Sequence, residues 1–262
     1  MSIQYFKEFP VVQYGFTDDP DDTKGVTDIT KRVGIRRDFA KYVNSYYTED
    51  IPDGSTPEQV ALDVYGSPYD HWILLHCNNV VDPYFDWVLD AQKFDIYIQK
   101  KYPDEVMVLT QTKDNYIVGE TITGSISGAT AIVKSCNPEL GQITYESSSS
   151  TAWDTSTPDT IVGSVSNLQV TIESYGKEFA AAKFYEVVRT NSDGTEDRLI
   201  VDKGFTNAQR ELLPGGINSW AAPVAVDNAS FESRLNEENR KVKILQPELV
   251  ELFENEFKEK IQ

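Results

Sequence analysis

"TPEQVALDVYGSPYDHWILLHCNN", residues 56–79, contains the signals for two short helices in immediate succession. Thr56 can cap the first helix, because its hydroxyl accepts a backbone N–H at the helix start. Pro57 suits the first helical position, and Gln59 completes a capping box. Gly66 readily adopts the left-handed backbone that ends many helices. We therefore predict a first helix between Pro57 and Gly66.

A second helix is predicted directly after the first. Ser67 supplies its cap, Pro68 its first position and Asp70 an acidic third position, which suits the positive end of the helix dipole. Asn78 and Asn79 end this helix, because asparagine tolerates left-handed backbone. Two capped helices in so short a stretch predict a compact helical unit.

The second helix carries both histidines of the chain, His71 and His76, followed by Cys77. Five residues correspond to about 140° around a helix, whereas two helical ligands of one metal lie three or four residues apart. Cys77 is about 100° from His76, which disfavours a cysteine–histidine catalytic pair. The sequence has no third histidine and no C-x-x-C. We therefore predict no metal, no cofactor and no catalytic residue here, and we interpret the helix as a packing element.

Outward from these helices, the helical unit is predicted to cover residues 51–103, with a third helix from about Asp90 to Lys101. Residues 1–50 are predicted to form an N-terminal arm with strands. Within that arm, "DDPDD" (18–22) is interpreted as a solvated acidic loop, because it lacks the spaced ligands and the glycine of a calcium loop.

Residues 104–178 have a different character and predict an inserted small all-β module. Short β-branched segments alternate there with Gly, Ser, Thr and Asn, as in a barrel of about five strands. "GETITGS" (119–125) lacks the lysine of a phosphate loop, and "GSISG" (124–128) lacks the serine of a nucleophile elbow. We interpret the glycines of both motifs as turn residues between strands.

Residues 179–262 are predicted to contain a hairpin, an irregular loop, a strand and a final helix. Asp193 and Gly194 mark the hairpin turn, and the loop covers about residues 205–225. "RKVKIL" (240–245) alternates like a strand, and a proline then opens the helix. The apolar residues on one side of that helix are Leu249, Val250, Phe253, Phe257 and Ile261.

The charge of the chain excludes two classes of partner. A formal net charge of −18 repels phosphate backbones and anionic bilayers, so we predict neither nucleic-acid nor membrane binding. With 40% hydrophobic and 11% aromatic residues, the chain can bury a substantial core. The N-terminus has no stretch like a signal peptide, so we expect a soluble protein made in a reducing cytoplasm.

Residues 53–103 resemble the core of the baseplate wedge protein 53 family of T-even-type contractile-tailed bacteriophages. The resemblance is carried by "DGSTPEQVA", "YG", "HW" before an apolar run, "NN", "DP", the following tryptophan, and a helix ending in "KYP". It continues in "YFKEFPVVQY", in the "FYEVV" hairpin and in the C-terminal strand and helix. The β module at 104–178 departs from the family pattern as an insertion.

The resemblance implies a structural subunit without enzymatic activity. Its fold would be α+β, with a LysM-like helical core, flanking strands, extended arms and the inserted barrel-like module. It would join adjacent baseplate wedges in several copies around a symmetric baseplate, contacting a wedge protein 6-like subunit and a lysozyme-like small wedge subunit. It would be assembled in the host cytoplasm and reside in the virion tail. The predicted motif core or interface consists of Trp72, Asn78, Asn79, Asp82, Pro83, Trp87, Phe253 and Phe257.

Two alternatives follow from the same residues. A LysM-like part can indicate a peptidoglycan-binding module, although such proteins usually bring an export signal or a hydrolase domain. A tail-associated cell-wall hydrolase would need a pair of catalytic carboxylates. The chain has 42 acidic residues, and no motif singles out two of them.

Overall fold

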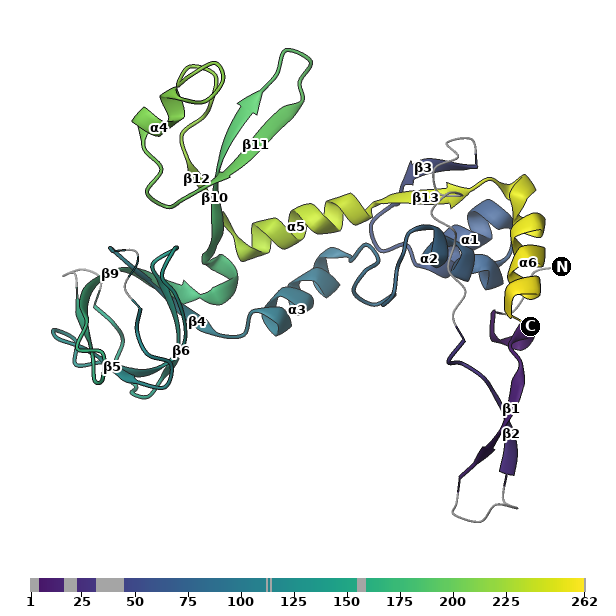
Figure 1. Ribbon diagram of the computed structural model, residues 1–262, viewed down its shortest axis with the longest axis horizontal. Helices are drawn as coiled ribbons and strands as arrows, with labels where there is room; N and C mark the ends of the chain where they lie inside the picture. The colour runs from purple at the N-terminus through teal and green to yellow at the C-terminus, as the bar shows by residue number, and fades with distance from the viewer. Residues whose placement is uncertain are drawn as a thin grey trace. The chain divides into compact units, whose positions relative to one another are not determined.

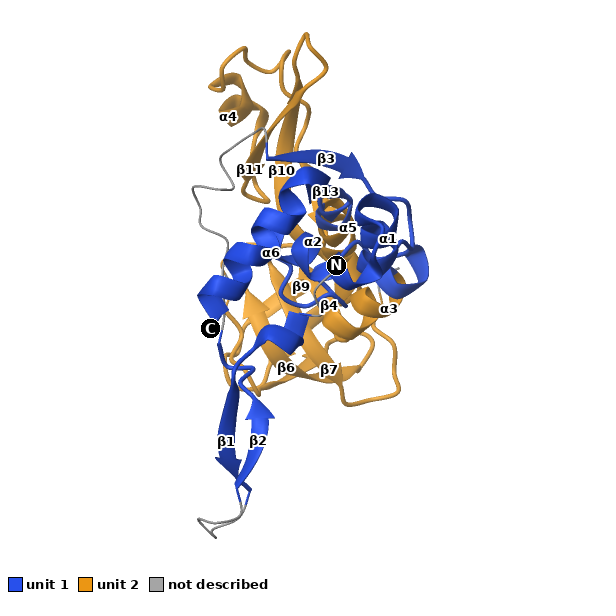
Figure 2. Ribbon diagram, turned by 90° about the vertical axis from the view of Figure 1, so that its right-hand side faces the viewer, with its two compact units in different colours: residues 1–94, 235–262 blue, residues 95–234 orange. Residues whose placement is uncertain are grey.

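The computed structural model describes residues 5–16, 23–31, 45–111, 113, 115–154 and 159–261. The chain divides into two compact units, one made of residues 1–94 and 235–262 and the other of residues 95–234 (Figures 1 and 2). The chain passes from unit 1 to unit 2 within helix α3 (Ala91–Lys101) and returns within helix α5 (Asn228–Asn239).

Helix α1 (Pro57–Tyr65) begins and ends as predicted. The Thr56 hydroxyl accepts the Gln59 N–H at 3.3 Å, and the Gln59 side chain accepts the Thr56 N–H at 3.0 Å. Gly66 follows with a φ of 76°, and its N–H bonds to the Leu62 carbonyl. Both ends of the helix are therefore fixed by local hydrogen bonds that the sequence encodes.

The second predicted helix begins as a 3-10 turn at Pro68–Asp70 and continues as α2 (His71–Cys77). The Ser67 hydroxyl accepts the Tyr69 N–H at 3.3 Å, which confirms the predicted cap. Asp70 is buried and makes no capping hydrogen bond to the start of α2. Asn79 has a φ of 54°, which confirms the left-handed end.

Strand β3 (Tyr46–Asp50) precedes α1 and pairs antiparallel with β13 (Lys241–Leu245), near the other end of the chain. The sequence predicts β13 but not its partner. Val242 and Ile244 alternate inward from β13. This first core of unit 1 consists of Ile51, Val60, Ala61, Leu74, Trp87, Val88, Val242 and Ile244.

Helix α6 (Pro247–Ile261) and the 3-10 turn Tyr5–Glu8 enclose a second core in unit 1. The predicted apolar side of α6 is confirmed, since its five apolar residues all belong to this core or pack against it. The buried members are Phe9, Trp72, Ile73, Leu245, Phe257 and Ile261. Strands β1 (Val11–Gly15) and β2 (Thr23–Thr27) then form an antiparallel hairpin. The predicted acidic loop at 18–22 lies outside the described residues.

The inserted module in unit 2 is a closed barrel in the order β4-β7-β6-β5-β8-β9, which confirms the predicted barrel-like class. It has six strands rather than about five, because the prediction omitted the short strand β8, which follows a polar loop. The strands are β4 (Glu105–Leu109), β5 (Thr121–Gly124), β6 (Thr130–Asn137), β7 (Gln142–Ser147), β8 (Thr160–Gly163) and β9 (Gln169–Lys177).

The barrel contains an internal two-fold repeat. "ETITGSISGA" (120–129) corresponds to "DTIVGSVSNL" (159–168), and the strands read symmetrically outward from the central β5–β8 pair. The Ser125 N–H donates to the Thr160 carbonyl, and the equivalent Ser164 N–H donates to the Thr121 carbonyl, both at 2.9 Å. The turn of each half is therefore hydrogen-bonded to a strand of the other half.

A buried carboxylate holds each of these turns. Glu120 accepts the N–H groups of Val165 and Ser166 at 3.0 and 2.9 Å. In the other half, Asp159 accepts those of Ile126 and Ser127 at 2.8 and 3.2 Å. Burial alone would raise the pKa of both carboxyl groups, but these hydrogen bonds outweigh it and hold each pKa below its usual value.

The predicted turn glycines of the module have a steric reason as well. A Cβ atom on Gly124 would lie 2.3 Å from the Asp159 carboxylate, and one on Gly163 would lie 2.7 Å from that of Glu120. Side chains at these two positions would displace the carboxylates. Gly124 and Gly163 therefore have a steric role in the barrel's architecture.

Unit 2 also contains a three-stranded sheet in the order β11-β10-β12. Strands β10 (Ala182–Thr190) and β11 (Glu196–Val201) form the predicted hairpin, with Gly194 at a φ of 83° in its turn. The prediction of an irregular loop at about residues 205–225 is wrong in part. This segment contains the capped helix α4 (Asn207–Glu211) and the start of β12 (Val224–Asp227), which pairs with β10.

Helix α5 was not predicted from the sequence. Two buried carboxylates, Glu232 of α5 and Glu186 of β10, attach the part of this helix that lies in unit 2 to the neighbouring segments. Glu232 accepts the hydroxyls of Tyr97 at 3.1 Å and Tyr102 at 2.7 Å, and pairs with Lys101 at 2.9 Å. Two residues further along α5, Arg234 pairs with the buried Glu186 of β10 at 2.9 Å. These contacts fix the helix by polar groups, which explains why its sequence shows little apolar periodicity.

Replacing Glu120 by Gln should destabilise the barrel by about 2 kcal/mol or more, because an amide NH2 group would face backbone donors that the carboxylate now accepts. The measurement is chemical unfolding followed by hydrogen exchange of residues 105–177. Glu139→Gln is the matched control, since Glu139 is exposed. Equal stability of both variants would contradict the assigned role.

Acid should weaken the hydrogen bonds by which Glu120 and Asp159 hold the two turns of the barrel. Because the folded-state pKa values lie below the usual 4.5 and 3.8, their stabilisation is complete above about pH 4.5 and is lost as the pH falls through the folded values. The difference in stability between the wild type and a Glu120→Gln, Asp159→Asn variant should therefore narrow below about pH 4. A constant difference down to acid unfolding would contradict this.

Candidate functional site

Aromatic side chains gather around Trp72 on the surface of α2 that faces α6. The Trp72 ring centroid lies 4.7 Å from that of Phe257 and 5.6 Å from that of Phe253, which stacks on it. Tyr5, from the N-terminal 3-10 turn, lies 5.4 Å from Trp72 on another side. Trp72, Phe253 and Phe257 are thus core residues joining three segments that are far apart in the sequence.

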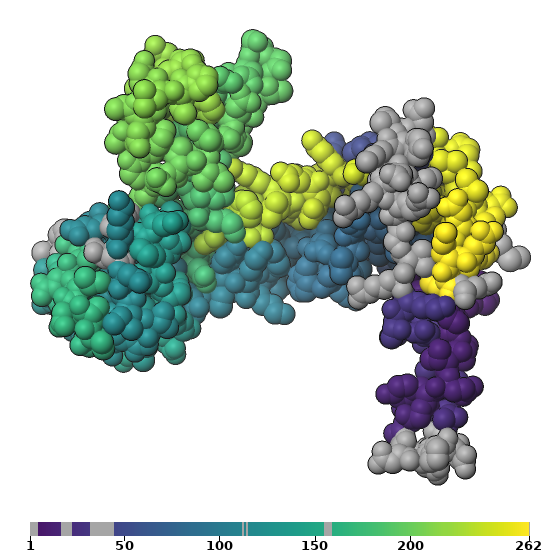
Figure 3. Space-filling view, viewed as in Figure 1, coloured from purple at the N-terminus to yellow at the C-terminus, as the bar shows by residue number. Residues whose placement is uncertain are grey.

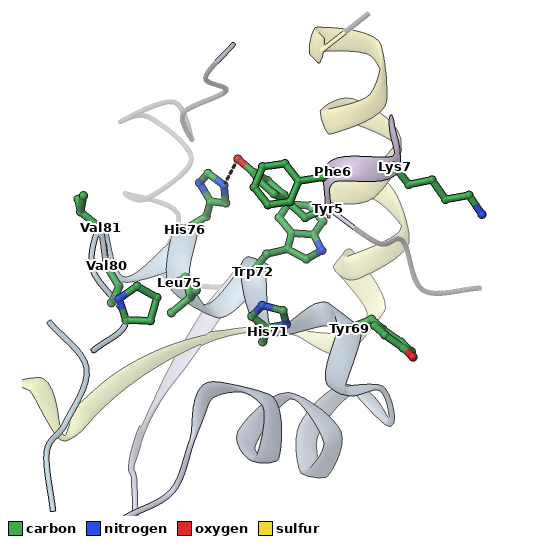
Figure 4. Close-up of a pocket in the computed structure, with 11 residues that line it drawn as sticks. Tyr5, Phe6, Lys7, Tyr69, His71, Trp72, Leu75, His76, Val80 and Val81 are labelled. Carbon is green, nitrogen blue, oxygen red and sulfur yellow. Dashed lines mark hydrogen bonds between the residues drawn. The ribbon is translucent and has the colours of Figure 1, made fainter. Parts of the chain in front are cut away.

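A groove of about 790 Å³ lies beside this cluster in unit 1 (Figure 4). Its walls come from the N-terminal 3-10 turn, from α2 and from the segment that follows α2. In the close-up, the Lys7 side chain extends away from the other residues that line the groove (Figure 4). The lining residues are Tyr5, Phe6, Lys7, Tyr69, His71, Trp72, Leu75, His76, Val80, Val81 and Pro83.

Both histidines line this groove, although helix geometry separates them. His76 Nε2 lies 3.4 Å from the Tyr5 hydroxyl, and burial lowers the pKa of His76. His71 Nδ1 lies instead 2.9 Å from the Pro68 carbonyl, within its own turn. Each histidine therefore has a separate partner, and the two do not form a pair.

Cys77 packs against the aromatic core, and burial raises the pKa of its thiol to about 12. A thiol with so high a pKa is a poor nucleophile at neutral pH.

In the described part of the chain, no group of three His, Cys, Asp or Glu side chains is placed to hold a metal ion. No helix among the described residues is long and apolar enough to cross a bilayer.

Asn78 connects α2 to the C-terminal strand. Its side-chain amide donates to the Lys243 carbonyl and accepts the Lys243 N–H, both at 2.8 Å. The same amide group also donates to the Leu74 carbonyl at 2.8 Å. Asn78 thus pairs with the edge of β13 as a strand residue would, while it also ends the helix.

The segment after α2 is shaped by its acidic residues. Asp82 accepts the Tyr84 N–H at 2.9 Å, and Asp86 accepts the N–H groups of Val81 and Asp82 at 3.1 and 2.9 Å. Trp87 then enters the core, and its indole N–H donates to the Ser55 carbonyl at 2.8 Å. These bonds turn the chain back toward α1.

This arrangement leaves apolar side chains on the outside. Val81 is 84% exposed and Tyr84 is 81% exposed, and Phe6 and Tyr69 are also largely exposed beside the groove. The sequence analysis predicted the interface at eight motif residues, and these four exposed residues were not among them. Only the final tertiary structure separates Trp72 and Trp87, which are buried, from Val81 and Tyr84, which are available to a partner. We call the groove, together with the exposed side chains of Phe6, Tyr69, Val81 and Tyr84, the groove surface.

The structure thus assigns different tasks to the eight predicted residues. Trp72, Trp87 and Phe257 are buried, and Phe253 is partly buried against Trp72. Asn78, Asn79 and Asp82 shape the backbone at the end of α2. Of the eight, Trp72 and Pro83 line the groove, so only these two are placed to contribute directly to it.

Comparison with known proteins gives a partial match. Residues 10–104 match the family model described as base plate wedge protein 53. The chain is also similar to the baseplate wedge protein gp53 of Enterobacteria phage T4, with 36% identity over 68 residues. That alignment covers 25% of this chain and spans 33% of the relative. The family match includes α1, α2 and the segment after α2, and it ends before the barrel.

Replacing Asn78 by Ala should destabilise unit 1 by about 1–2 kcal/mol, because the N–H and carbonyl groups of Lys243 lose their side-chain partner at a site that water can partly reach. Asn79→Gly is the matched control, since it keeps the left-handed backbone and removes an exposed side chain. Stability is measured by chemical unfolding. A loss as large for Asn79→Gly as for Asn78→Ala would refute the bridging role.

Proposed function

We propose that the protein is a structural subunit of a contractile phage tail baseplate, on the premise that residues 10–104 match the family model described as base plate wedge protein 53. It joins adjacent wedges, is present in several copies around the baseplate and resides in the virion after assembly in the host cytoplasm. Its partners are a wedge protein 6-like subunit and a lysozyme-like small wedge subunit. The family match is the observation that carries this proposal.

The architecture of unit 1 supports a role in assembly. Its motif residues build packing and turns, and Cys77 is a partly buried thiol whose pKa is raised by burial. The exposed Val81 and Tyr84 sit in the segment that Asp82 and Asp86 hold in place. Rigidly presented aromatic and aliphatic side chains of this kind are typical anchors of protein interfaces.

The core of unit 1 is LysM-like in our proposal. Strand β3, helices α1 and α2, and strand β13 follow one another as strand, helix, helix and strand, with the two strands paired antiparallel. The second strand comes from the C-terminal part of the chain, since the rest of the chain is inserted after α2. The order and the pairing of these elements support the proposal.

One observation favours a second candidate, a peptidoglycan-binding module. The groove is lined by Tyr5, Phe6, Tyr69 and Trp72, and aromatic faces of this kind can stack on sugar rings. Sedimentation with purified peptidoglycan separates the two functions. We expect the protein to stay in the supernatant, and clear cosedimentation would favour the glycan-binding function.

The wedge function is tested by mixing the purified protein with the other wedge proteins of the same phage. We expect a discrete complex in size-exclusion chromatography. A Phe6→Ser, Val81→Ser variant should bind about tenfold more weakly or worse, because the groove surface loses two apolar anchors. Both side chains are exposed, so the variant should fold as the wild type does.

Leu212→Ser is the matched control, since Leu212 is an exposed apolar residue of unit 2. It should bind like the wild type. Failure of the wild type to co-elute with the wedge proteins under any ionic condition would overturn the proposed function. Normal binding by the groove variant would remove the groove surface from the interface and leave the function in place.

A further inference from the structure

One side of the barrel in unit 2 presents no charged side chain. The two halves of the internal repeat, residues 121–133 and 160–172, contain no Asp, Glu, Lys or Arg, although 25% of the chain is charged. The structure describes both halves completely. We call their outward-facing side chains the neutral face. Its members on the strands are Thr121, Thr123, Thr130, Ile132, Thr160, Val162, Gln169 and Thr171, and Ile126 and Val165 join them from the two turns.

The neutral face follows the two-fold pattern of the repeat. Strands β5 and β8 run antiparallel at its centre, so the turns that follow them lie at opposite ends of the face. Ile126 and Val165 occupy equivalent positions in these turns and are 55% and 62% exposed. Ile132 of β6 lies beside Thr121 and is 42% exposed. The face therefore carries apolar side chains at both ends and along one side, with threonines between them.

The carboxylates that precede the two halves are not available to a partner. Glu120 and Asp159 are both buried beneath the turns. Each accepts two backbone N–H groups and a serine hydroxyl from the turn of the other half. Their charges are therefore compensated inside the barrel, and the surface above them stays neutral.

The opposite side of the barrel is charged and attached to the remainder of unit 2. In the closed strand order, β5 and β8 lie opposite β4 and β7. Glu105 of β4 pairs with Lys177 at 3.0 Å, and the Gln142 side chain of β7 donates to the Ala182 carbonyl at 2.9 Å. In the views, β5 lies at the end of the barrel away from α3, and no other described segment of unit 2 covers that end (Figures 1 and 3). The neutral face is thus left free.

Charge indicates which partner fits this face. A contact between two copies related by a two-fold axis brings the same surface of both copies together, so its charges meet charges of the same sign. The chain has 42 acidic and 24 basic residues, so contact through its charged surface would oppose carboxylates. The neutral face allows two copies to meet without that cost. A basic partner, in contrast, would find no accessible carboxylate on it.

We propose that the neutral face of the barrel binds the neutral face of a second copy of this chain. The side chains of Ile126, Ile132, Val162 and Val165 enter the contact, and the threonines pack around them. This surface lies in unit 2, beyond the residues that match the family model, and the inference does not rest on the proposed function. Because the repulsion between the acidic copies is screened by salt while the contact itself is neutral, salt strengthens the association.

The test is sedimentation velocity of the full-length protein at several protein concentrations and two salt concentrations. We expect the sedimentation coefficient to rise with protein concentration. The dissociation constant should fall about threefold or more between about 50 and 500 mM salt. Ile132→Glu and Ile132→Lys should each weaken self-association by about tenfold or more, because either sign of charge is buried without a partner.

Leu212→Glu is the matched control, since it adds the same charge at an exposed apolar residue outside the barrel, and it should associate like the wild type. Methyl NMR of the wild type gives a readout that needs no variant. The methyl signals of Ile126, Ile132 and Val165 should shift as the protein concentration rises, whereas those of Leu212 should stay in place.

Three outcomes would overturn this inference. They are a monomer at every protein and salt concentration, unchanged association of both Ile132 variants, and methyl shifts that leave the neutral face unaffected. If the protein stays monomeric and the Ile132 variants instead lose binding to a wedge protein, the face belongs to that partner and not to a second copy. Failure of the wild type to bind any wedge protein would overturn the proposed function and leave this contact in place.

Discussion

The pairing of β3 with β13 is the constraint on which the rest of unit 1 depends. It joins Tyr46–Asp50 to Lys241–Leu245, so the two ends of the chain must come together before either core can form. Once β13 is in place, Val242 and Ile244 fill the space against α1 and α2, and Asn78 bonds to its edge. Helix α6 follows directly and delivers Phe257 to Trp72. Loop closure over so many residues carries a substantial entropic cost, which these contacts offset together.

The barrel of unit 2 has a different organisation, because its contacts are local. Its two halves repeat one pattern of strand, turn and carboxylate, and each half holds the turn of the other. Because Glu120 and Asp159 each accept N–H groups from the turn of the other half, neither turn is satisfied by its own segment alone. Such a module can be inserted between α3 and β10 without altering the pairing that builds unit 1, since its core residues are drawn from its own strands. This is consistent with the family match ending before the barrel.

The candidate site was predictable only in part. Sequence motifs identified Trp72, Asn78 and Trp87, and all three hold unit 1 together, but motifs cannot separate a packing residue from an exposed one. That distinction arises when Asp82 and Asp86 turn the chain and leave Val81 and Tyr84 outside. The helical angle separates His71 from His76, and in the structure each has its own hydrogen-bond partner. It did not indicate that Tyr5 would lie against His76 or that both histidines would line one groove, because the contact between Tyr5 and His76 joins segments 71 residues apart in the sequence.

The sequence by itself determined the elements whose signals are local. Helix α1 is bounded by the Thr56–Gln59 capping box and Gly66, the β10–β11 turn by Asp193 and Gly194, and α6 by Pro247 and its apolar side. Tertiary structure alone decided the partner of β3 and the formation of helix α5. Strand partners are selected by burial of side chains from distant segments, and α5 is fixed by Glu232 and Arg234 through polar contacts. Neither cause leaves a periodic trace in the segment itself, so both become visible only when the chain has folded.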